Sequence, residues 1–263
     1  GIIMNKNLNL RMILYELRNI NGNFMPHFFG IIFPNLMSLL LSKTIGGQMP
    51  AQVRQSMATS IMLTTSMIIP MAIMLLGYGC LYSIEAERTI PLRMHLFGIS
   101  ARTEIIAKIT AHLIFLTLAF IIFAVFHIVI MDVQAPAVSS LLCLILCLYC
   151  IGIILLVIAH AITNLLQKFS LTFGVTMFLY FGFMILTGMM GIETSQLPKA
   201  LQAVARTLPM TYISNDFAEF WQGGSYNFIP LIQSFLFFGA SAGILLLLSL
   251  YKNRRTVGSL EHY

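Results

Sequence analysis

Apolar residues gather in six long stretches that are separated by short polar segments. A helix needs about 20 mainly apolar residues to cross the hydrocarbon core of a membrane. The stretches are continuous rather than alternating, which favours helices over the strands of a membrane barrel. We therefore expect an all-α integral membrane protein, with residues 1–263 forming a single transmembrane domain. The predicted spans cover residues 24–41, 57–82, 109–131, 138–161, 171–192 and 228–251.

The segments outside the spans predict three further elements. Residues 4–23 are expected to form an amphipathic helix on the membrane surface, with a flexible tail as the alternative. Residues 85–108 form the most charged loop, and residues 193–227 form the longest connection. The apolar stripe expected in the N-terminal helix consists of Leu10, Ile13, Leu14, Leu17 and Ile20, while Arg11, Glu16, Arg18 and Asn19 occupy its other faces. Gly1, Ile2 and Ile3 precede Met4, and whether they are native is left open.

The composition narrows the class of protein. Hydrophobic residues make up 58% of the chain and charged residues only 9%, whereas a typical soluble domain is roughly 45–50% apolar and about 25% charged. Soluble, disordered and nucleic-acid-wrapping proteins are thereby excluded. The net charge of +6 is better explained by loop charges that fix the orientation in the membrane.

The distribution of Lys and Arg predicts that both ends of the chain are cytoplasmic. With the N-terminus inside, the cytoplasmic segments carry the larger share of these residues. They hold Lys6, Arg11, Arg18, Arg88, Arg93, Arg102, Lys108, Lys168, Lys252, Arg254 and Arg255, whereas the outside segments hold Lys43, Arg54, Lys199 and Arg206.

Several kinds of chemistry lack their sequence signature. The chain has no phosphate-binding Gly-x-x-x-x-Gly-Lys-Ser/Thr loop, no His-Glu-x-x-His and no Gly-x-Ser-x-Gly. Charged residues are absent from the middle of every predicted span, where ion-driven transporters usually keep them. We therefore expect any transport to draw its energy from another subunit. Cys143, Cys147 and Cys150 share one helical face, and packing is favoured over a metal site, so no metal or cofactor is predicted in this chain.

The loop at 85–108 and the segment before the last span resemble those of a known family. The loop opens with Glu85, Glu87 and Arg88, continues with an apolar helix (Leu92, Leu96, Phe97) and a Gly98-Ile99-Ser100 turn, and ends at Lys108. Leu197-Pro198, the stripe Leu201, Val204 and Leu208, Pro209, Tyr212 and Phe217 form the second match. In this order they resemble the ABC-2 type exporter permeases. The departures are Arg88-Thr89, where the family often has Gly-Thr, and Pro91 inside the helix.

The resemblance implies an export pump of two permease chains, identical or different, and two separate ATPase chains that hold ATP and Mg²⁺. The loop would then be the coupling helix that docks on the ATPase, with Glu85, Glu87, Arg88, Leu92, Arg93, Leu96 and Phe97 as its residues. We expect Glu85 and Glu87, at the edge of the membrane, to pair with basic residues of this chain or of its partner. The second match would be an extracellular re-entrant segment that includes Pro198, Pro209 and Tyr212.

The same resemblance places the second and fifth spans along the pathway. It makes Thr64, Thr65, Ser66, Phe178, Tyr180 and Phe181 pathway candidates, although ordinary helix packing also explains each of them. An apolar path suits a drug, an antimicrobial peptide or a lipid-like cargo, exported across a plasma membrane that is expected to be bacterial. Two alternatives remain: a membrane scaffold or sensor of the same fold, and a secondary transporter or channel.

Overall fold

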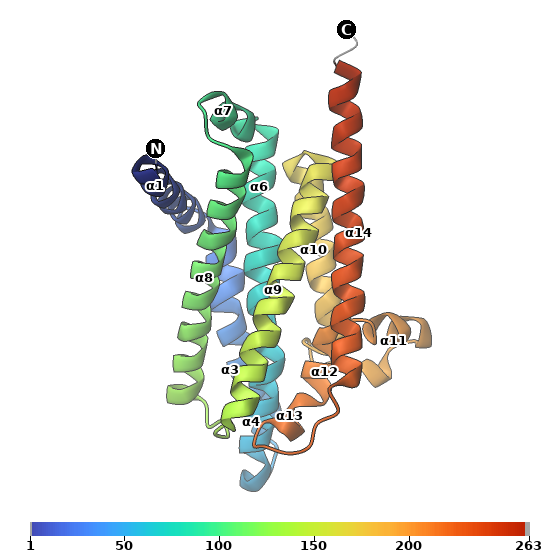
Figure 1. The fold of residues 1–263 in the computed structure, drawn as a ribbon. Coiled ribbons are helices and arrows are strands. Elements are labelled where there is room, and N and C mark those ends of the chain that lie inside the picture. Colours follow the sequence, from blue (N-terminus) through green and yellow to red (C-terminus); the bar gives the residue numbers. More distant parts are fainter. Residues whose placement is uncertain (1, 261–263) are drawn as a thin grey trace.

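The computed structural model describes residues 2–260, with side chains for residues 9–51 and 53–253. Gly1 lies outside the described residues. The fold is a bundle of long helices drawn in Figure 1, and residues 2–260 contain no β-strand. In chain order the elements are α1 (Ile2–Asn21), α2 (Phe24–His27), η1 (Phe28–Ile32), α3 (Phe33–Gly46), α4 (Ala51–Ser66), α5 (Ile68–Pro70), η2 (Met71–Gly77), α6 (Tyr78–Glu87), α7 (Ile90–Leu96), α8 (Ala101–Ile130), α9 (Val138–Leu166), α10 (Phe169–Leu186), η3 (Thr194–Gln196), α11 (Lys199–Ala205), α12 (Pro209–Asn215), α13 (Phe217–Phe220) and α14 (Ile229–Leu260).

The prediction of six membrane-spanning helices is confirmed in the described part of the chain, although their limits differ from the predicted ones. The fifth span stops at Leu186 rather than at residue 192, because the backbone turns at Gly188 and Gly191 with φ of +83° and +80°. Glycine adopts such angles without steric cost. The spans are Phe24–Gly46, Val53–Glu87, Ala101–Ile130, Val138–Leu166, Phe169–Leu186 and Ile229–Asn253.

The second span is the central helix of the bundle. Its most apolar window is 83% buried, whereas no other span exceeds 44%. Helices α9 and α10 pack along it, and α14 packs on the outer side of α9. The hydrophobic core therefore forms around residues 67–77 of this span, which are apolar on all sides, as expected for a fully enclosed stretch of helix.

The first and second spans change from α-helical to π-helical hydrogen bonding next to their prolines. Segment η1 follows Pro26 within one turn, and η2 follows Pro70 directly. Proline lacks a backbone N–H and so interrupts the regular α-helical hydrogen-bond pattern, and π-helical turns occur as local irregularities inside α-helices. The two π segments lie against each other. A Cβ atom added at Gly30 would lie 2.7 Å from Cγ1 of Ile73.

The two ends of the bundle carry different elements. Helices α1 and α7 and the last turns of α14 lie at one end, whereas α11, α12 and α13 lie toward the other (Figure 1). We call these the α7 end and the α13 end. Both described ends of the chain thus lie on the same side of the bundle. The assignment of the α7 end to the cytoplasm rests on the distribution of Lys and Arg and stays a prediction.

Candidate coupling site

Helix α7 projects from the end of the bundle with its apolar side chains exposed. Leu96 is 77% exposed and Phe97 is 86% exposed, and Leu92, Arg88 and Arg93 are also exposed. Exposed apolar residues beside cations are typical of a surface that meets another protein. The predicted apolar helix of the loop is therefore present, and Leu92, Leu96 and Phe97 are largely free of packing inside this chain, whereas Ile90 and Met94 are half-buried.

The backbone at the start of α7 adopts an unusual conformation. Thr89 has φ of +56°, in the left-handed region that a β-branched residue rarely enters. Pro91 lies in the first turn of α7, where its missing N–H costs no hydrogen bond. The structure thus accommodates both departures from the family pattern. Thr89 adopts a strained backbone conformation, and Pro91 occupies a helix position where proline is tolerated. Contacts of α7 with both α6 and α8 connect it to two membrane-spanning helices.

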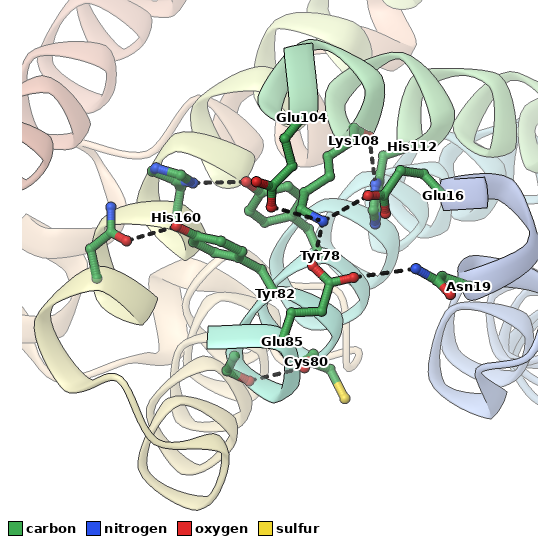
Figure 2. Close-up of polar contacts among 12 residues, drawn as sticks. Glu16, Asn19, Tyr78, Cys80, Tyr82, Glu85, Glu104, Lys108, His112 and His160 are labelled. Carbon is green, nitrogen blue, oxygen red and sulfur yellow. Dashed lines mark hydrogen bonds and ion pairs between the residues drawn. The ribbon is translucent and has the colours of Figure 1, made fainter. Parts of the chain in front are cut away.

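Below α7 lies a buried cluster of one lysine and three glutamates, shown in Figure 2, which we call the Lys108 cluster. The ammonium nitrogen of Lys108 lies 2.7 Å from Oε1 of Glu16 and 3.6 Å from Oε1 of Glu104, and it also contacts the carboxylate of Glu85. Asn19 donates a hydrogen bond of 3.2 Å to Glu85. The cluster therefore ties α1, α6 and α8 together at the α7 end.

The charges of this cluster are not balanced, because three carboxyl groups face one ammonium. Burial raises the pKa of Glu16, and the negative charge of Glu85 adds to the effect, while Lys108 opposes it. Removing a single partner from a buried ionic group leaves an uncompensated charge and is strongly destabilising. The attachment of α1 to the bundle therefore depends in part on Lys108, beside the apolar packing of α1 on α8.

A column of neutral polar groups continues from the cluster toward α9. Tyr78 and Nδ1 of His160 are joined by a hydrogen bond of 2.7 Å, and Tyr82 donates one of 2.9 Å to Asn164. The rings of Tyr82 and His160 stack in parallel (Figure 2). Side chains from α6 and α9 are therefore held in fixed positions next to the ionic cluster.

The two glutamates predicted for the coupling loop have different partners. Glu85 is buried and has a basic partner within this chain, Lys108, which the sequence did not single out. Within this chain, Glu87 contacts a backbone group, and its pairing with a basic residue of a partner stays a prediction. Its carboxylate accepts a hydrogen bond of 2.8 Å from the backbone N–H of Phe169, at the start of α10. The first N–H groups of a helix lack partners within the helix and attract a negative charge, which explains this contact.

Glu16 lies away from Leu10 and Leu14, as the sequence predicts, but its face of the N-terminal helix is packed. Glu16 is only 2% exposed, and Ile20, which the sequence places on the membrane-facing stripe, is buried on the same face as Met12 and Glu16. Leu10 and Leu14 are exposed instead. Helix α1 packs along α8, and Lys108 on α8 draws the polar side of α1 inward. The exposed leucines then form the side available to the membrane surface.

The six pathway candidates do not gather on one surface of this chain. Thr64 reaches Ser214 at 3.2 Å in a recess at the α13 end, whereas Thr65 and Ser66 donate to carbonyls of their own helix. Phe178 and Phe181 are exposed on α10, and Tyr180 is buried against Phe29. The exposed aromatic residues remain available to face a second chain or a substrate.

The residues predicted for the segment before the last span lie in short helices. Pro198 precedes α11, and Pro209 opens α12 and is buried. The hydroxyl of Tyr212 donates a hydrogen bond of 2.7 Å to the carbonyl of Arg206 between these two helices. The turn from α11 into α12 is therefore fixed by the chain itself.

Comparison with protein families assigns the chain. The family model of the ABC-2 type transporter matches residues 12–219, which include α7 and the whole Lys108 cluster. The chain belongs to the ABC-2 type transporter family. It is accordingly a multi-pass membrane permease of an ABC transporter, a transport component that is not itself catalytic. Searches of curated proteins and of solved structures found no match.

Proposed function

We propose that this chain is the permease subunit of an ATP-driven exporter that moves a hydrophobic or amphipathic substrate, such as a drug, an antimicrobial peptide or a lipid-like molecule, out of the cell. Two cytoplasmic ABC ATPase subunits bind ATP and Mg²⁺ and supply the energy. A second permease chain, identical or different, completes the membrane part in the plasma membrane of a bacterial cell.

The observation that carries the proposal is the exposed apolar surface of α7. Leu92, Leu96 and Phe97 lie outside the bundle although each is apolar, and Arg88 and Arg93 lie beside them. This surface gains stability only by burial against another protein, and the two arginines supply specificity for acidic groups on it. Members of the ABC-2 type transporter family generally work with ABC ATPase partners, so an ATPase groove is the partner proposed.

The Lys108 cluster supports a mechanical role for α7. A displacement of α7 moves the ends of α6 and α8, because α7 is joined to both within a few residues. Lys108 couples the same two helices to α1 through Glu85 and Glu16. Since packed interiors transmit strain rather than absorb it, the movement reaches the central helix of the bundle.

The position of the charges supports an apolar cargo. Along the second and third spans, the acidic and basic residues lie near the ends: Arg54 at the start of the second span, and Glu85, Glu87, Arg102, Glu104 and Lys108 near the α7 end. The segments nearer the middle of the membrane present apolar and aromatic side chains, which favour substrates with low polarity.

Co-purification tests the proposal directly. We expect the tagged chain, extracted in mild detergent from cells that also express ABC ATPases, to retain an ATPase subunit detected by its vanadate-sensitive ATP hydrolysis. The double variant Arg93→Asp and Leu96→Asp places two negative charges on α7 and should lose this partner. Arg206→Asp with Leu201→Asp makes the same changes on exposed residues of the α13 end and should retain it.

Two outcomes would overturn the proposal. Equal recovery of the ATPase with both double variants would show that α7 is not the docking element. Substrate flux by the purified chain alone in vesicles, without ATP, would favour a secondary transporter or channel instead.

A further inference from the structure

Helices α8 and α9 follow each other in the chain but enclose a pocket instead of packing closely. Helix α8 packs on α1, whereas α9 packs on α14, α6 and η2. Between α8 and α9, toward the α13 end, lies a pocket of about 420 Å³. Its volume falls within the range of roughly 300–1,000 Å³ that is typical of ligand sites in proteins. We call it the α8–α9 pocket.

The wall of this pocket is almost entirely apolar. Phe120 and Ala124 come from α8, Leu144 and Ile145 come from α9, and Trp221 closes the end of the pocket after α13. No Asp, Glu, Lys or Arg lines it among the residues that the structure describes. The pocket therefore offers nothing to recognise a charged ligand.

The hydroxyl, imidazole and indole groups that reach the wall have partners within the protein. His127 contacts the carbonyl of Phe123 at 2.8 Å and the hydroxyl of Ser38 at 2.6 Å. The indole N–H of Trp221 donates to the carbonyl of Gln134 at 2.8 Å. Because these groups are already satisfied, a ligand gains little from hydrogen bonds here and much from dispersion contacts.

Hydrogen bonds hold the connection between the two helices in a fixed position, so the pocket is a permanent feature of the fold. The N–H of Gln134 donates to the hydroxyl of Thr59 at 2.8 Å, and its carbonyl accepts from Trp221. The N–H of Ala137 donates to the carbonyl of Trp221 at 2.8 Å, and Ser140 donates to the carbonyl of Phe220 at 2.5 Å. These contacts keep the start of α9 against α13 and α4, which separates it from the end of α8.

The surroundings of the pocket determine what fills it. Ile121 and Ile128 on α8 and Ile145 on α9 are exposed at its edges, within segments that span the membrane, so the medium outside is hydrocarbon. Water gains little in an apolar cavity, because a buried water molecule needs several polar partners to hold it. An empty pocket of this size forfeits the dispersion contacts of its whole lining.

We propose that the α8–α9 pocket is a lipid-binding site that holds an acyl chain of a membrane phospholipid, inserted between α8 and α9 with its end against Trp221. This site lies away from α7, and of the six pathway candidates only Ser66 lines it. It explains how two helices that the loop connection holds apart remain well packed in the membrane.

The only tryptophan of the chain makes the proposal directly testable. Trp221 is buried and lines the α8–α9 pocket, so a lipid chain that contacts the indole has to do so from this pocket. We would reconstitute the protein in dioleoylphosphatidylcholine vesicles with a rising fraction of phosphatidylcholine whose acyl chain carries two bromines at a defined position. Bromine quenches tryptophan fluorescence on contact. We expect most of the emission to be lost at a low fraction of brominated lipid, with a maximum for one bromine position.

Two neighbouring residues of α8 provide a matched pair of variants. Ala124→Phe fills the pocket with an aromatic ring and should abolish the quenching. Val125→Phe adds a ring of the same kind one residue away, on an exposed position that does not line the pocket, and should quench like the wild type. Ile145→Phe fills the pocket from α9 and should repeat the effect of Ala124→Phe if the first variant fails to fold, as judged by helix content and melting temperature.

The outcomes separate the proposal from its competitors. Weak quenching of the wild-type protein at all bromine positions would overturn it, because the pocket would then be closed or covered by another protein chain. Equal quenching of wild type, Ala124→Phe and Val125→Phe would also overturn it, because the contact would then be unrelated to the pocket.

Discussion

The two ends of the helix bundle are assembled by different kinds of interaction. At the α7 end, helices distant in sequence are joined by one buried lysine among three carboxyl groups. At the α13 end, the connections are joined by neutral hydrogen bonds to carbonyls and by a group of packed rings that includes Phe217, Phe220, Tyr226 and Phe228. The first arrangement depends on a single charge, whereas the second is spread over many small contacts.

The two ends therefore differ in how much stability a single substitution removes. Removal of one buried charge partner costs several kcal/mol, whereas removal of one neutral hydrogen bond costs about 1 kcal/mol. Substitutions at the α7 end should therefore have larger effects on stability than comparable ones at the α13 end, and they should be sensitive to pH.

The largest effect is expected for Lys108→Met. The three carboxyl groups of the cluster lose their cation, and the change should destabilise the folded protein by about 3–5 kcal/mol. Thermal unfolding of the purified protein in detergent, followed by circular dichroism, measures this. Lys199→Met at the exposed surface of the α13 end should unfold like the wild type. Combining Lys108→Met with Glu85→Gln should recover part of the loss, and an unchanged melting temperature for Lys108→Met would contradict the prediction.

The next effect is a pH dependence that comes from Glu16. Burial raises its pKa in the folded state, so the folded protein holds a proton that the unfolded chain has already lost. This contribution to stability is complete below the ordinary pKa of the carboxyl group and disappears as the pH rises through the raised value. Melting temperatures measured across this interval should fall in the wild type and less in Glu16→Gln. Glu193→Gln, on an exposed residue of the α13 end, should keep the wild-type profile, and an identical profile for Glu16→Gln would exclude this role.

A smaller effect is expected for Ser140→Ala at the α13 end. The variant removes a buried hydrogen bond of 2.5 Å to the carbonyl of Phe220 and should cost about 1 kcal/mol. Ser139→Ala changes the neighbouring exposed residue and should cost nothing measurable in the same melting experiment. A loss for Ser140→Ala as large as that for Lys108→Met would remove the contrast between the two ends.

The smallest effect on stability, and the most informative for transport, is expected for Glu87→Gln. The amide still accepts from Phe169 but loses the charge at the start of α10, which is worth about 0.3–1 kcal/mol. If the proposed function holds, ATP hydrolysis by the assembled transporter continues while export falls. Parallel assays of both activities in vesicles measure this, with Glu219→Gln at the α13 end as the control. Unchanged substrate-stimulated hydrolysis together with unchanged export would reject the role of Glu87.

The fold could be predicted from the sequence because its main signal is local. Six apolar stretches of sufficient length leave few alternatives to six helices in a membrane. The limits were less accessible, since the third span begins at Ala101, where Ser100 accepts a hydrogen bond from the N–H of Thr103, and not at residue 109. A serine followed three residues later by an acidic or polar residue marks the start of a helix. A prediction that only counts apolar residues overlooks this signal.

Only part of the Lys108 cluster could be predicted from the sequence. Glu104 and Lys108 are four residues apart, which is the spacing of an ion pair on one helical face. Glu16 lies 92 residues before Lys108, and no local pattern indicates that these side chains meet. The burial of Glu16 follows from the packing of α1 on α8, a tertiary contact that overrides the polar character of the residue.

The left-handed conformation of Thr89 has a consequence for the equilibrium between arrangements of α7. Holding an L-residue in this region costs about 1–2 kcal/mol. Relaxation of Thr89 removes this cost, and the removal alone multiplies the relative population of such an arrangement by a factor of roughly 5–30. An ATPase whose binding allows Thr89 to leave the left-handed conformation gains this factor in its affinity for α7. An ATPase that binds α7 with Thr89 in its present conformation does not.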